Sequence, residues 1–427
     1  MWRVKPAFKS LSLAAIVLIL FASEALPASA ASLTVGPSGQ YKTITDAVDA
    51  AQPGGTITLG PGTYVENVAI TKPLTLRGEG SSATTVRAAN PGQDVIRPQG
   101  TGIRIEGMTI SGATGASGVH VDHVSGFTVA GVAVRNTEQA VYLDGASNGE
   151  VSNSNLADNG YGVYCDGASR NTVAGNVASG EQGVPPALGD GIYMYYCNGN
   201  TITHNNLSAN HVFGISLFHS SDNTITNNSI LSNQDIGVRL RESDNNTLTY
   251  NTFSWNANLG ILSITEAGDQ ICLNNFVSQK SPHPGVQANI LTSPQKMTYE
   301  YNGATHSGYI SNYYSDYNAT DANGDGIGDT PSVYGDPYPL IQPFERYGTI
   351  SVASSATPTA GTKPIASNPS TAPVVGDQNS SALTLPRFQI WYAAVGLLVA
   401  AFVLLGAVIW KYYRPPPEAY EDQAYEE

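Results

Sequence analysis

The chain has 427 residues, a formal net charge of −14 and a charged fraction of only 13%. Binding to nucleic acid phosphates requires rows of lysine and arginine, and 20 basic residues against 34 acidic ones exclude that class of partner. The three cysteines are too few to form the disulfide framework of a small secreted fold.

The first 30 residues have the pattern of a secretory signal peptide. Arg3, Lys5 and Lys9 precede an apolar run over residues 11–22, and Ala28 and Ala30 flank a small-residue cleavage site. We therefore expect an exported chain whose folded ectodomain covers residues 31–349.

A short amphipathic helix is expected over residues 43–51. Apolar residues recur there at helical spacing, at Ile44, Ala47, Val48 and Ala51. Thr43, with Asp46 three positions later, is suited to cap the start of the helix. Such a helix covers the open end of a repetitive fold.

One four-residue phrase of the type Gly-Val-Tyr-Leu recurs seven times, beginning at residues 118, 140, 162, 191, 214, 237 and 260. A period of 22 to 29 residues is typical of a solenoid. Apolar and polar residues alternate within each repeat, which indicates strands. A leucine-rich repeat has a similar period, but its leucine frame and helical return do not suit coils rich in Asn, Ser, Thr and Gly. We predict an all-β, right-handed parallel β-helix.

Asparagines recur in three rows, and we expect their stacked amides to form hydrogen-bonded ladders along the axis. The rows are Asn148, Asn171, Asn200, Asn223 and Asn246; Asn153, Asn176, Asn205, Asn228 and Asn251; and Asn210, Asn233 and Asn256.

Two columns of outward residues follow from stacking the repeats in phase. The first is His120, Tyr142, Tyr164, Tyr193, Ser216 and Arg239, and the second is Asp122, Asp144, Asp166, Tyr195, Phe218 and Arg241. Coils about 4.8 Å apart would place three carboxylates in a row beside three tyrosines. The insertion at residues 182–188 would wall one end of this groove, next to Asp190.

We interpret this face as a glycan-binding groove. Sugar rings favour flat aromatic faces beside carboxylates, and the substrate-binding candidates are His120, Tyr142, Tyr164, Tyr193, Tyr195 and Asp190. Asp122, Asp144 and Asp166 are the catalytic candidates, because a row of like charges raises the pKa of one member and leaves its neighbour ionised. A structural alternative stays open, since Asp-Gly is also a turn signal and tyrosine favours sheet surfaces.

A calcium loop is expected within residues 321–331. Its ligands would be the oxygens of Asp321, Asn323, Asp325 and Asp329 and the Ile327 carbonyl. The twelfth position is Ser332, where a complete EF-hand has glutamate, so Ca²⁺ would have a structural role in the C-terminal cover, with a plain turn as the alternative.

The C-terminal residues predict a membrane anchor. Residues 350–386 are rich in Ser, Thr and Pro and read as a stalk, and residues 390–410 form an uncharged run bordered by Trp391 and Trp410. Lys411 and Arg414 place the acidic tail, residues 411–427, in the cytoplasm and the repeats outside.

The chain resembles right-handed parallel β-helix proteins with carbohydrate-binding and sugar-hydrolase repeats, and more closely the NosD-like periplasmic copper-binding family. The resemblance lies in the Asn-Thr-Ile-Thr phrases at residues 200 and 223, in residues 311–317 and 321–331, and in Tyr338-Pro-Leu340. It covers most of residues 33–346.

The resemblance implies copper, for which His, Cys and Met are the favoured ligands. Cys165 is expected in an inward column with Leu143 and Met194, and Cys272 in one with Leu248. Cys197 is expected in a different column from Cys165, which makes a disulfide between them unfavourable. Only His120 and His123, near Asp122, lie close together in the sequence.

The sequence therefore predicts a membrane-anchored surface protein that binds a polysaccharide. Two alternatives remain. One is an enzyme, a polysaccharide lyase or hydrolase that uses the aspartate row. The other is a NosD-like factor for the maturation of a metal site, or a purely architectural surface protein.

Overall fold

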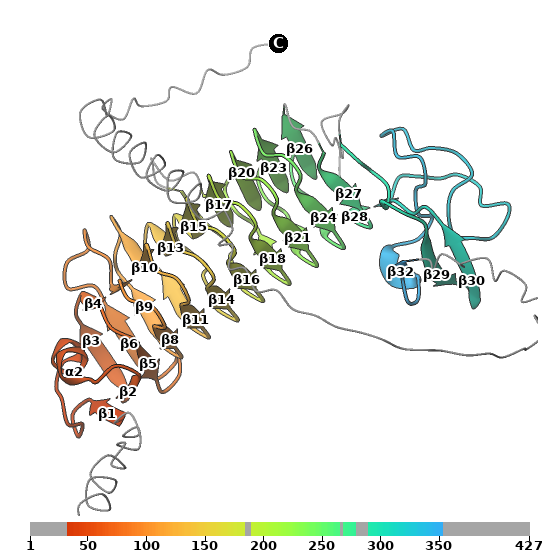
Figure 1. Ribbon diagram of the computed structural model, residues 1–427. Coiled ribbons are helices and arrows are strands. Elements are labelled where there is room, and N and C mark those ends of the chain that lie inside the picture. The colour runs from red at the N-terminus through yellow and green to blue at the C-terminus, as the bar shows by residue number, and fades with distance from the viewer. Residues whose placement is uncertain (1–31, 184–188, 265–267, 279–288, 353–427) are drawn as a thin grey trace, which may run out of the picture. The chain divides into compact units, whose positions relative to one another are not determined.

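The computed structural model describes residues 32–183, 189–264, 268–278 and 289–352. These residues belong to one compact unit, Met1–Ala356. Parallel strands from successive coils stack in it as rungs (Figure 1). The coils form a right-handed parallel β-helix of about ten turns, which confirms the predicted fold class.

Three parallel sheets form the faces of each coil. Sheet A has eleven strands, β1 (Ser32–Val35), β2 (Gly55–Leu59), β5 (Leu74–Gly78), β8 (Arg104–Glu106), β11 (Thr128–Ala130), β14 (Glu150–Ser152), β16 (Thr172–Ala174), β18 (Thr201–Thr203), β21 (Thr224–Thr226), β24 (Thr247–Thr249) and β27 (Gln270–Cys272). Sheet C has nine strands, β4 (Val68–Ile70), β7 (Ile96–Pro98), β10 (Ser117–Asp122), β13 (Gln139–Asp144), β15 (Tyr161–Asp166), β17 (Ile192–Tyr195), β20 (Ile215–Phe218), β23 (Val238–Arg241) and β26 (Ile261–Ile264).

Sheet B, the third face, consists of two ladders. The first contains β3 (Gly62–Val65), β6 (Thr84–Arg87), β9 (Thr109–Ser111) and β12 (Ala133–Arg135). The second contains β19 (Asn206–Ser208), β22 (Ser229–Leu231), β25 (Thr252–Ser254), β28 (Asn275–Val277) and β31 (Tyr313–Tyr314). Single bridges through Asn155 and Val177 connect the two ladders.

The core is a column of apolar side chains inside the coil. Strands alternate between buried and more exposed residues, as in β17, where Ile192 and Met194 are buried between the half-buried Tyr193 and Tyr195. Because each coil contributes the same positions, the buried side chains of one coil rest on those of the next. A repeat alone has no partner for this surface, so the coils are stable only as a stack.

The predicted capping helix is confirmed as α2 (Ile44–Ala50), with its apolar face on the first coil. The Thr43 hydroxyl oxygen accepts a hydrogen bond from the Asp46 amide at 3.1 Å. Glu66 adds a second cap that the sequence did not predict, since its carboxylate accepts from the amides of Ile44 and Thr45 at 2.8 and 3.0 Å.

The asparagine ladders are present, with two corrections to their first members. The Asn228 amide group donates to the Asn251 side-chain oxygen and to the Ile202 carbonyl, and its own oxygen accepts from Asn205. Asn148 and Asn153 do not belong to the ladders. They lie one position earlier, exposed, with φ of 52° and 49°, and Gly149 and Ser154 occupy the ladder positions instead.

The C-terminal residues of the unit form a second apolar cluster beyond the coils. The antiparallel strands β29 (Met297–Tyr301), β30 (Ala304–Gly308) and β32 (Ser351–Val352), together with the 3-10 helix η1 (Phe344–Arg346), belong to this region. Cys272 is buried here and not in the core column, because Ile271 and not Cys272 aligns with Leu248. The predicted position of Cys272 was therefore wrong by one residue.

Cys165 lies in the inward column with Leu143 and Met194, as predicted. Cys197 occupies a different column, since its amide donates to Ser220 and its sulfur accepts from the Ala168 amide. Its thiol nevertheless meets that of Cys165, and the contact raises the pKa of Cys165, with burial as the second cause. The two cysteines are closer than the column argument suggested.

Several predicted segments lie outside the described residues. They are the signal peptide, the loop at residues 184–188, nearly all of the stalk, the run at residues 390–410 and the acidic tail. Within residues 32–352 and their gaps, no helix has the length and apolar character needed to cross a membrane.

Candidate functional site

The outer face of sheet C carries both predicted columns in register. Tyr142 pairs with Tyr164 and Tyr164 with Tyr193, while Asp122 pairs with Asp144 and Asp144 with Asp166. The strands are parallel and unshifted, so residues about two dozen apart in the chain stand side by side. The predicted placement of these residues is confirmed.

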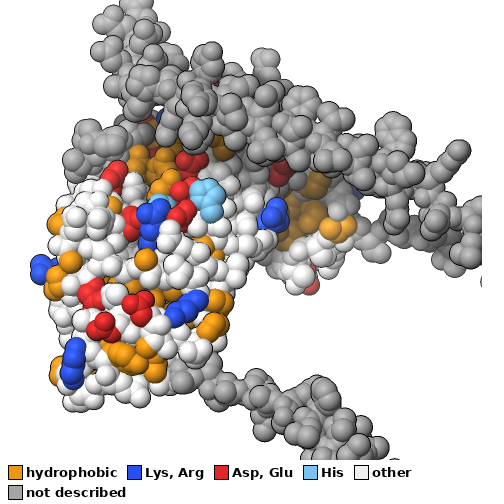
Figure 2. Space-filling model, turned by 60° about the vertical axis from the view of Figure 1, so that its left-hand side comes forward, with side chains coloured by type: hydrophobic (Ala, Val, Ile, Leu, Met, Phe, Trp, Pro, Cys, Tyr) orange, Lys and Arg blue, Asp and Glu red, His pale blue; other side chains and the backbone are white. Residues whose placement is uncertain are grey.

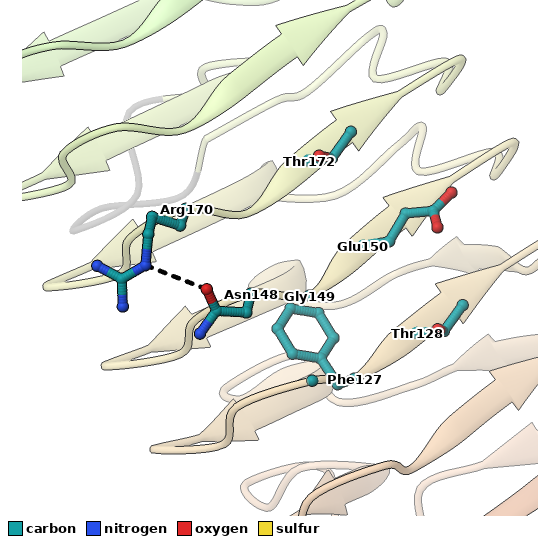
Figure 3. A pocket seen from close by; sticks show the side chains of 8 residues that line it. Phe127, Thr128, Asn148, Gly149, Glu150, Arg170 and Thr172 are labelled. Atoms are coloured by element: carbon teal, nitrogen blue, oxygen red, sulfur yellow. Dashed lines mark hydrogen bonds between the residues drawn. The ribbon is translucent and has the colours of Figure 1, made fainter. Parts of the chain in front are cut away.

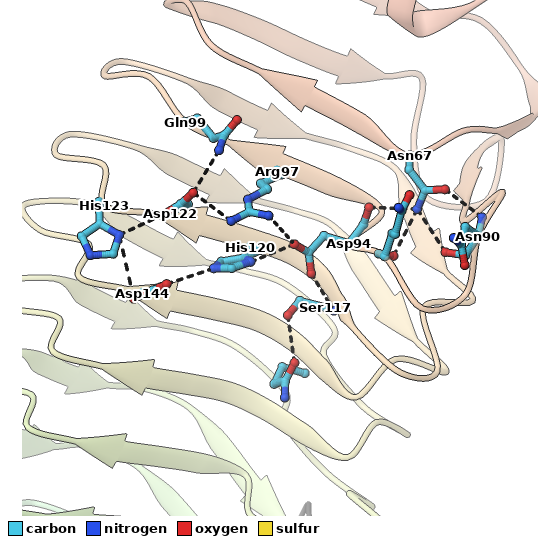
Figure 4. A network of polar contacts seen from close by, with 12 residues as sticks. Asn67, Asn90, Asp94, Arg97, Gln99, Ser117, His120, Asp122, His123 and Asp144 are labelled. Carbon is cyan, nitrogen blue, oxygen red and sulfur yellow. Dashed lines mark hydrogen bonds and ion pairs between the residues drawn. The ribbon is translucent and has the colours of Figure 1, made fainter. Parts of the chain in front are cut away.

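A cluster of acidic, basic and histidine side chains begins this face (Figure 4). His120 lies at its centre, with Nδ1 2.8 Å from the Asp94 carboxylate and Nε2 3.4 Å from that of Asp144. The ring is nine-tenths buried and stacks on Tyr142 at a centroid distance of 4.5 Å. His120 is thus held on three sides instead of lining an open groove.

Asp122 is the most strongly bonded carboxylate of the row. Its Oδ2 accepts from Arg97 at 3.0 Å and from Gln99 at 2.9 Å, and its Oδ1 lies 2.8 Å from His123 Nδ1. The hydrogen bond from Gln99, followed by that from His123, holds the pKa of Asp122 well below its usual value. Figure 2 shows such acidic, basic and histidine side chains gathered in one patch of this end of the coil.

Asp94, Arg97 and Gln99 were not predicted, although they complete the cluster. They precede the first repeated phrase, in β7 and just beside it, where the sequence Val-Ile-Arg-Pro-Gln has lost the glycine and tyrosine of that phrase. Their position was nevertheless recoverable, because Arg97 and Gln99 each lie 23 residues before the members of the columns, His120 and Asp122.

The acidic row has unequal members. Burial, and then the charge of Asp144, raises the pKa of Asp166, whereas that of Asp122 is lowered. Two carboxylates of one row therefore differ in proton affinity, as the sequence argument expected of a row of like charges.

The tyrosines form a continuous wall. Tyr164 and Tyr193 stack at 5.1 Å, and Tyr142 meets Tyr164 edge to face at 5.2 Å. Burial raises the pKa of all three, so the phenols are neutral at physiological pH. Within the described chain, none of the three hydroxyls has a hydrogen-bond partner.

The far half of the face changes from acidic to aromatic and cationic. Tyr195 stacks on Phe218 at 5.5 Å, and the Arg241 guanidinium lies 4.9 Å from the centroid of the Phe218 ring. Arg239 lies over Phe213 at 4.3 Å. Both contacts fit cation–π pairs, which hold the arginine heads against the wall.

Asp190 does not line the groove, and its assignment as a substrate-binding residue is corrected. It is fully buried, with Oδ1 accepting from the Phe213 amide at 3.1 Å and Oδ2 without a partner among the described residues. Burial raises its pKa to about 7, against the opposing charge of Arg239. Position 190 follows the column of Tyr161, which points into the coil, and this explains the error.

An open hollow lies on a different face, between sheet A and the turns that lead into it (Figure 3). Phe127 packs against Gly149 at its floor, and Arg170 donates to Asn148 at 3.1 Å along its rim. A side chain at position 149 would collide with the Phe127 ring, so this glycine is a packing requirement. The hollow contains none of the predicted site residues.

The predicted calcium loop is a tightly bonded turn. Asp321 accepts hydrogen bonds from the amides of Asp325 and Gly326 at 3.0 and 2.9 Å, and Asp325 accepts from the Ile327 amide at 2.9 Å. Asp329 accepts from Thr320 and from the Ala322 amide. Each carboxylate is oriented by the backbone of the loop itself.

Comparisons with known proteins give one family and several distant relatives. A family model described as "Periplasmic copper-binding protein (NosD)" matches residues 99–319. A cell surface glycoprotein of Methanothermus fervidus is 27% identical over 139 residues, which cover 32% of this chain and 22% of that protein. The match thus spans less than a quarter of the relative.

Similar solved structures include an alginate lyase from a Paenibacillus species, with a TM-score of 0.45, 18% identity, and coverage of 58% of this chain and 94% of the lyase. The Dettilon tailspike protein has a TM-score of 0.48 and 15% identity, with 64% of each chain covered.

The buried Asp190 predicts a stability that falls as pH rises. Its pKa is about 7 in the folded chain and 3.8 in the reference state, so between these values the folded protein keeps a proton that the unfolded chain has lost. The free energy of unfolding should therefore decrease from about pH 4 to about pH 7 and then level off. At about 1.4 kcal/mol per pKa unit, the contribution of Asp190 is at most about 4 kcal/mol.

Asp190→Asn keeps an oxygen for the Phe213 amide and removes the titration, so denaturant unfolding at a series of pH values should show a smaller decrease than the wild type. The exposed Asp222→Asn serves as the matched control and should retain the wild-type slope. Equal slopes for Asp190→Asn and the wild type would contradict the assignment.

Proposed function

Because the chain belongs to the NosD family of periplasmic copper-binding proteins through its β-helical coils, we propose that its function resides on the outer face of those coils, where it binds a glycan. The observation that carries the proposal is the row of unpartnered phenol hydroxyls of Tyr142, Tyr164 and Tyr193, in register beside the carboxylates of Asp144 and Asp166.

The two rows offer complementary hydrogen-bonding groups. A neutral phenol both donates and accepts, and an ionised carboxylate accepts only. A sugar presents hydroxyls that do both, so one hydroxyl donates to an aspartate while its neighbour accepts from a tyrosine. Coils about 4.8 Å apart repeat this pair of groups along the axis, which suits an extended polymer of repeating units.

The mode of binding differs from the flat stacking expected from the sequence. The Tyr164 and Tyr193 rings stack on each other, and one face of Tyr142 is covered by His120. Their faces are therefore occupied by neighbouring rings. The wall instead presents ring edges and hydroxyls that are already fixed by packing, which reduces the side-chain entropy lost on binding.

The charge of the wall favours a neutral glycan over its first coils. Asp122, Asp144 and Asp166 would repel a uronic acid, with about 1 kcal/mol for each close pair of charges in water and more where solvent is excluded. Arg239 and Arg241 lie several coils further along and favour the opposite sign of charge.

An extracytoplasmic location on the cell surface is part of the proposal. The family is described as periplasmic and the Methanothermus relative is named a cell surface glycoprotein. Residues 1–30 fit a signal peptide, and residues 390–410 fit a single-pass anchor that holds the repeats outside the membrane.

Cleavage of the glycan is the second candidate, favoured by one observation. Asp166 has a raised pKa and Asp122 a lowered one, and such divergence distinguishes the acid from the base in carboxylate-based catalysis. New reducing ends or unsaturated products in the binding assay below would identify a hydrolase or a lyase.

Tyr164→Phe provides the sharpest test of glycan binding, because it removes the hydroxyl and keeps the stacked ring. One hydrogen bond contributes about 0.5–1.5 kcal/mol, so retention of the full-length protein on a matching immobilised neutral polysaccharide should weaken by about 3- to 10-fold. Tyr250→Phe, on another face and packed against Phe344, should not change retention.

The proposal fails if no member of a panel of neutral and acidic polysaccharides retains the wild-type protein. It also fails if Tyr164→Phe and Tyr250→Phe behave alike on a polysaccharide that does retain it.

We also propose that the loop at residues 321–331 binds Ca²⁺ as a structural ion. The loop amides orient Asp321 and Asp325, which leaves carboxylate oxygens available at a turn of the spacing that calcium loops use.

Millimolar Ca²⁺ should raise the melting temperature of the wild type, because a ligand that binds only the folded state stabilises it. Asp325→Ala should abolish the rise, whereas Asp49→Ala on the exposed side of α2 should retain it. An unchanged melting temperature of the wild type with and without Ca²⁺, measured after treatment with a chelator, would refute the proposal.

A further inference from the structure

Two sets of side chains carry the donor atoms that copper uses, and only one fits. Cys165, Cys197 and Met194 bring sulfur atoms together inside the core. Metals bind the thiolate, however, and the contact with Cys197, together with burial, raises the pKa of Cys165 and keeps it protonated. The sulfur set therefore does not suit a metal.

The second set lies at the start of sheet C. Within the described chain, ligand atoms of His120, Asp122 and Asp144 all lie within 4.8 Å of one another. His123 borders the same space, with its Nδ1 2.8 Å from Asp122 and 4.0 Å from Asp144. Imidazole and carboxylate donors suit Cu²⁺ or Zn²⁺, and Cu²⁺ binds such sites more tightly than other divalent metals of its row.

Two of these side chains are anchored by one atom and present the other to the shared space. Asp94 binds His120 Nδ1 and itself accepts from the Ser117 amide at 3.0 Å, which leaves His120 Nε2 facing Asp144 (Figure 4). Arg97 and Gln99 hold Asp122 Oδ2 and leave Oδ1 on the side of His123. A carboxylate behind a ligating histidine is the usual arrangement at metal sites.

Asp144 is poorly satisfied by its present neighbours. Its oxygens lie 3.4 Å from His120 Nε2 and 4.0 Å from His123 Nδ1, which is longer than a good hydrogen bond. Two donors that each lie about 2.0–2.1 Å from a tetrahedral ion are roughly 3.3 Å apart, close to the first distance.

The net charge of the cluster also calls for a cation. Asp94, Asp122 and Asp144 contribute three negative charges and Arg97 one positive charge, so two negative charges remain when both imidazoles are neutral. An ordinary surface ion-pair network would have balanced charges and short contacts throughout. A bound divalent cation would neutralise this excess.

We infer that His120, Asp122 and Asp144, with His123 as an additional donor, form a Cu²⁺ site at the acidic end of the wall. The site does not depend on the proposed binding of a glycan. Asp94 is a positioning residue that orients His120, and Arg97 and Gln99 orient Asp122.

The test uses the full-length protein, freed of metal with a chelator and titrated with CuCl₂ or with ZnCl₂. We expect one tightly held Cu²⁺ per chain after gel filtration, with nitrogen hyperfine structure in its electron paramagnetic resonance spectrum and weaker retention of Zn²⁺. Asp144→Asn and His123→Asn should each weaken Cu²⁺ binding at least about 10-fold, and Asp94→Asn about 10- to 100-fold.

His219→Asn is the matched control. His219 occupies the same turn position as His123 four coils further along, with φ of 51° against 54°, and it also contacts a carboxylate, that of Glu242. It should leave Cu²⁺ uptake and the spectrum unchanged. Asn tolerates this backbone conformation, so His123→Asn and His219→Asn should fold equally well, as circular dichroism would verify.

Three results would overturn the inference. They are the absence of stoichiometric Cu²⁺ retention by the wild type, retention unaffected by both Asp144→Asn and His123→Asn, and an equal loss in His219→Asn. Tyr164→Phe should keep full Cu²⁺ uptake, so a failure of glycan binding and a failure of the metal site are recorded separately.

Discussion

The whole structure depends on the stacking of parallel strands in phase from coil to coil. A shift of one residue in any strand would move its core residues to the surface, because successive side chains point to opposite faces. The buried apolar column fixes the register, and the asparagine ladders reinforce it. Each ladder amide binds the coils on both sides, so a slip would leave several buried polar groups without partners, each at a cost of about 1–3 kcal/mol.

The same constraint creates the outer wall of sheet C. Residues that have nothing in common along the chain except a spacing of about two dozen become neighbours, and like residues form rows. Rows of tyrosine are stable by themselves, whereas a row of aspartates is not. The protein resolves this at one end by surrounding Asp122 with Arg97, Gln99 and His123, while Asp144 is left with long contacts. The acidic end of the wall is therefore built to hold a positive charge, and the aromatic middle to hold hydroxyls.

The sequence predicted the architecture and the main columns because the repeated phrase marks the register directly. Its errors occurred where the register had to be carried by other residues. Asn148 and Asn153 were misplaced by one position, since asparagine serves both the ladder and the exposed left-handed turn next to it. Cys272 was misplaced for a similar reason, because Ile271 and Cys272 are both apolar and only the structure shows which of them faces the core.

The candidate site was predicted less completely than the fold. Asp190 was assigned to the groove from its distance to Tyr193, but its side chain turns into the coil at a position where other coils have Tyr161 or Phe213. The orientation of the tyrosine rings depends on contacts between coils that no spacing reveals. Asp94, Arg97 and Gln99 belong to a coil that lacks the phrase, so the partners that orient His120 and Asp122 were missed.

The most direct test of in-phase stacking is a series of distances along one column of sheet A. Thr128, Thr201, Thr247 and Gln270 lie in this column, in the first, fourth, sixth and seventh coils counted from Thr128. Pulsed electron paramagnetic resonance on spin-labelled cysteine pairs that share Thr128 should give distances that increase by about 4.8 Å for each coil crossed. Distances that do not increase with the number of coils would contradict the stacked register on which the wall, the glycan proposal and the metal site all depend.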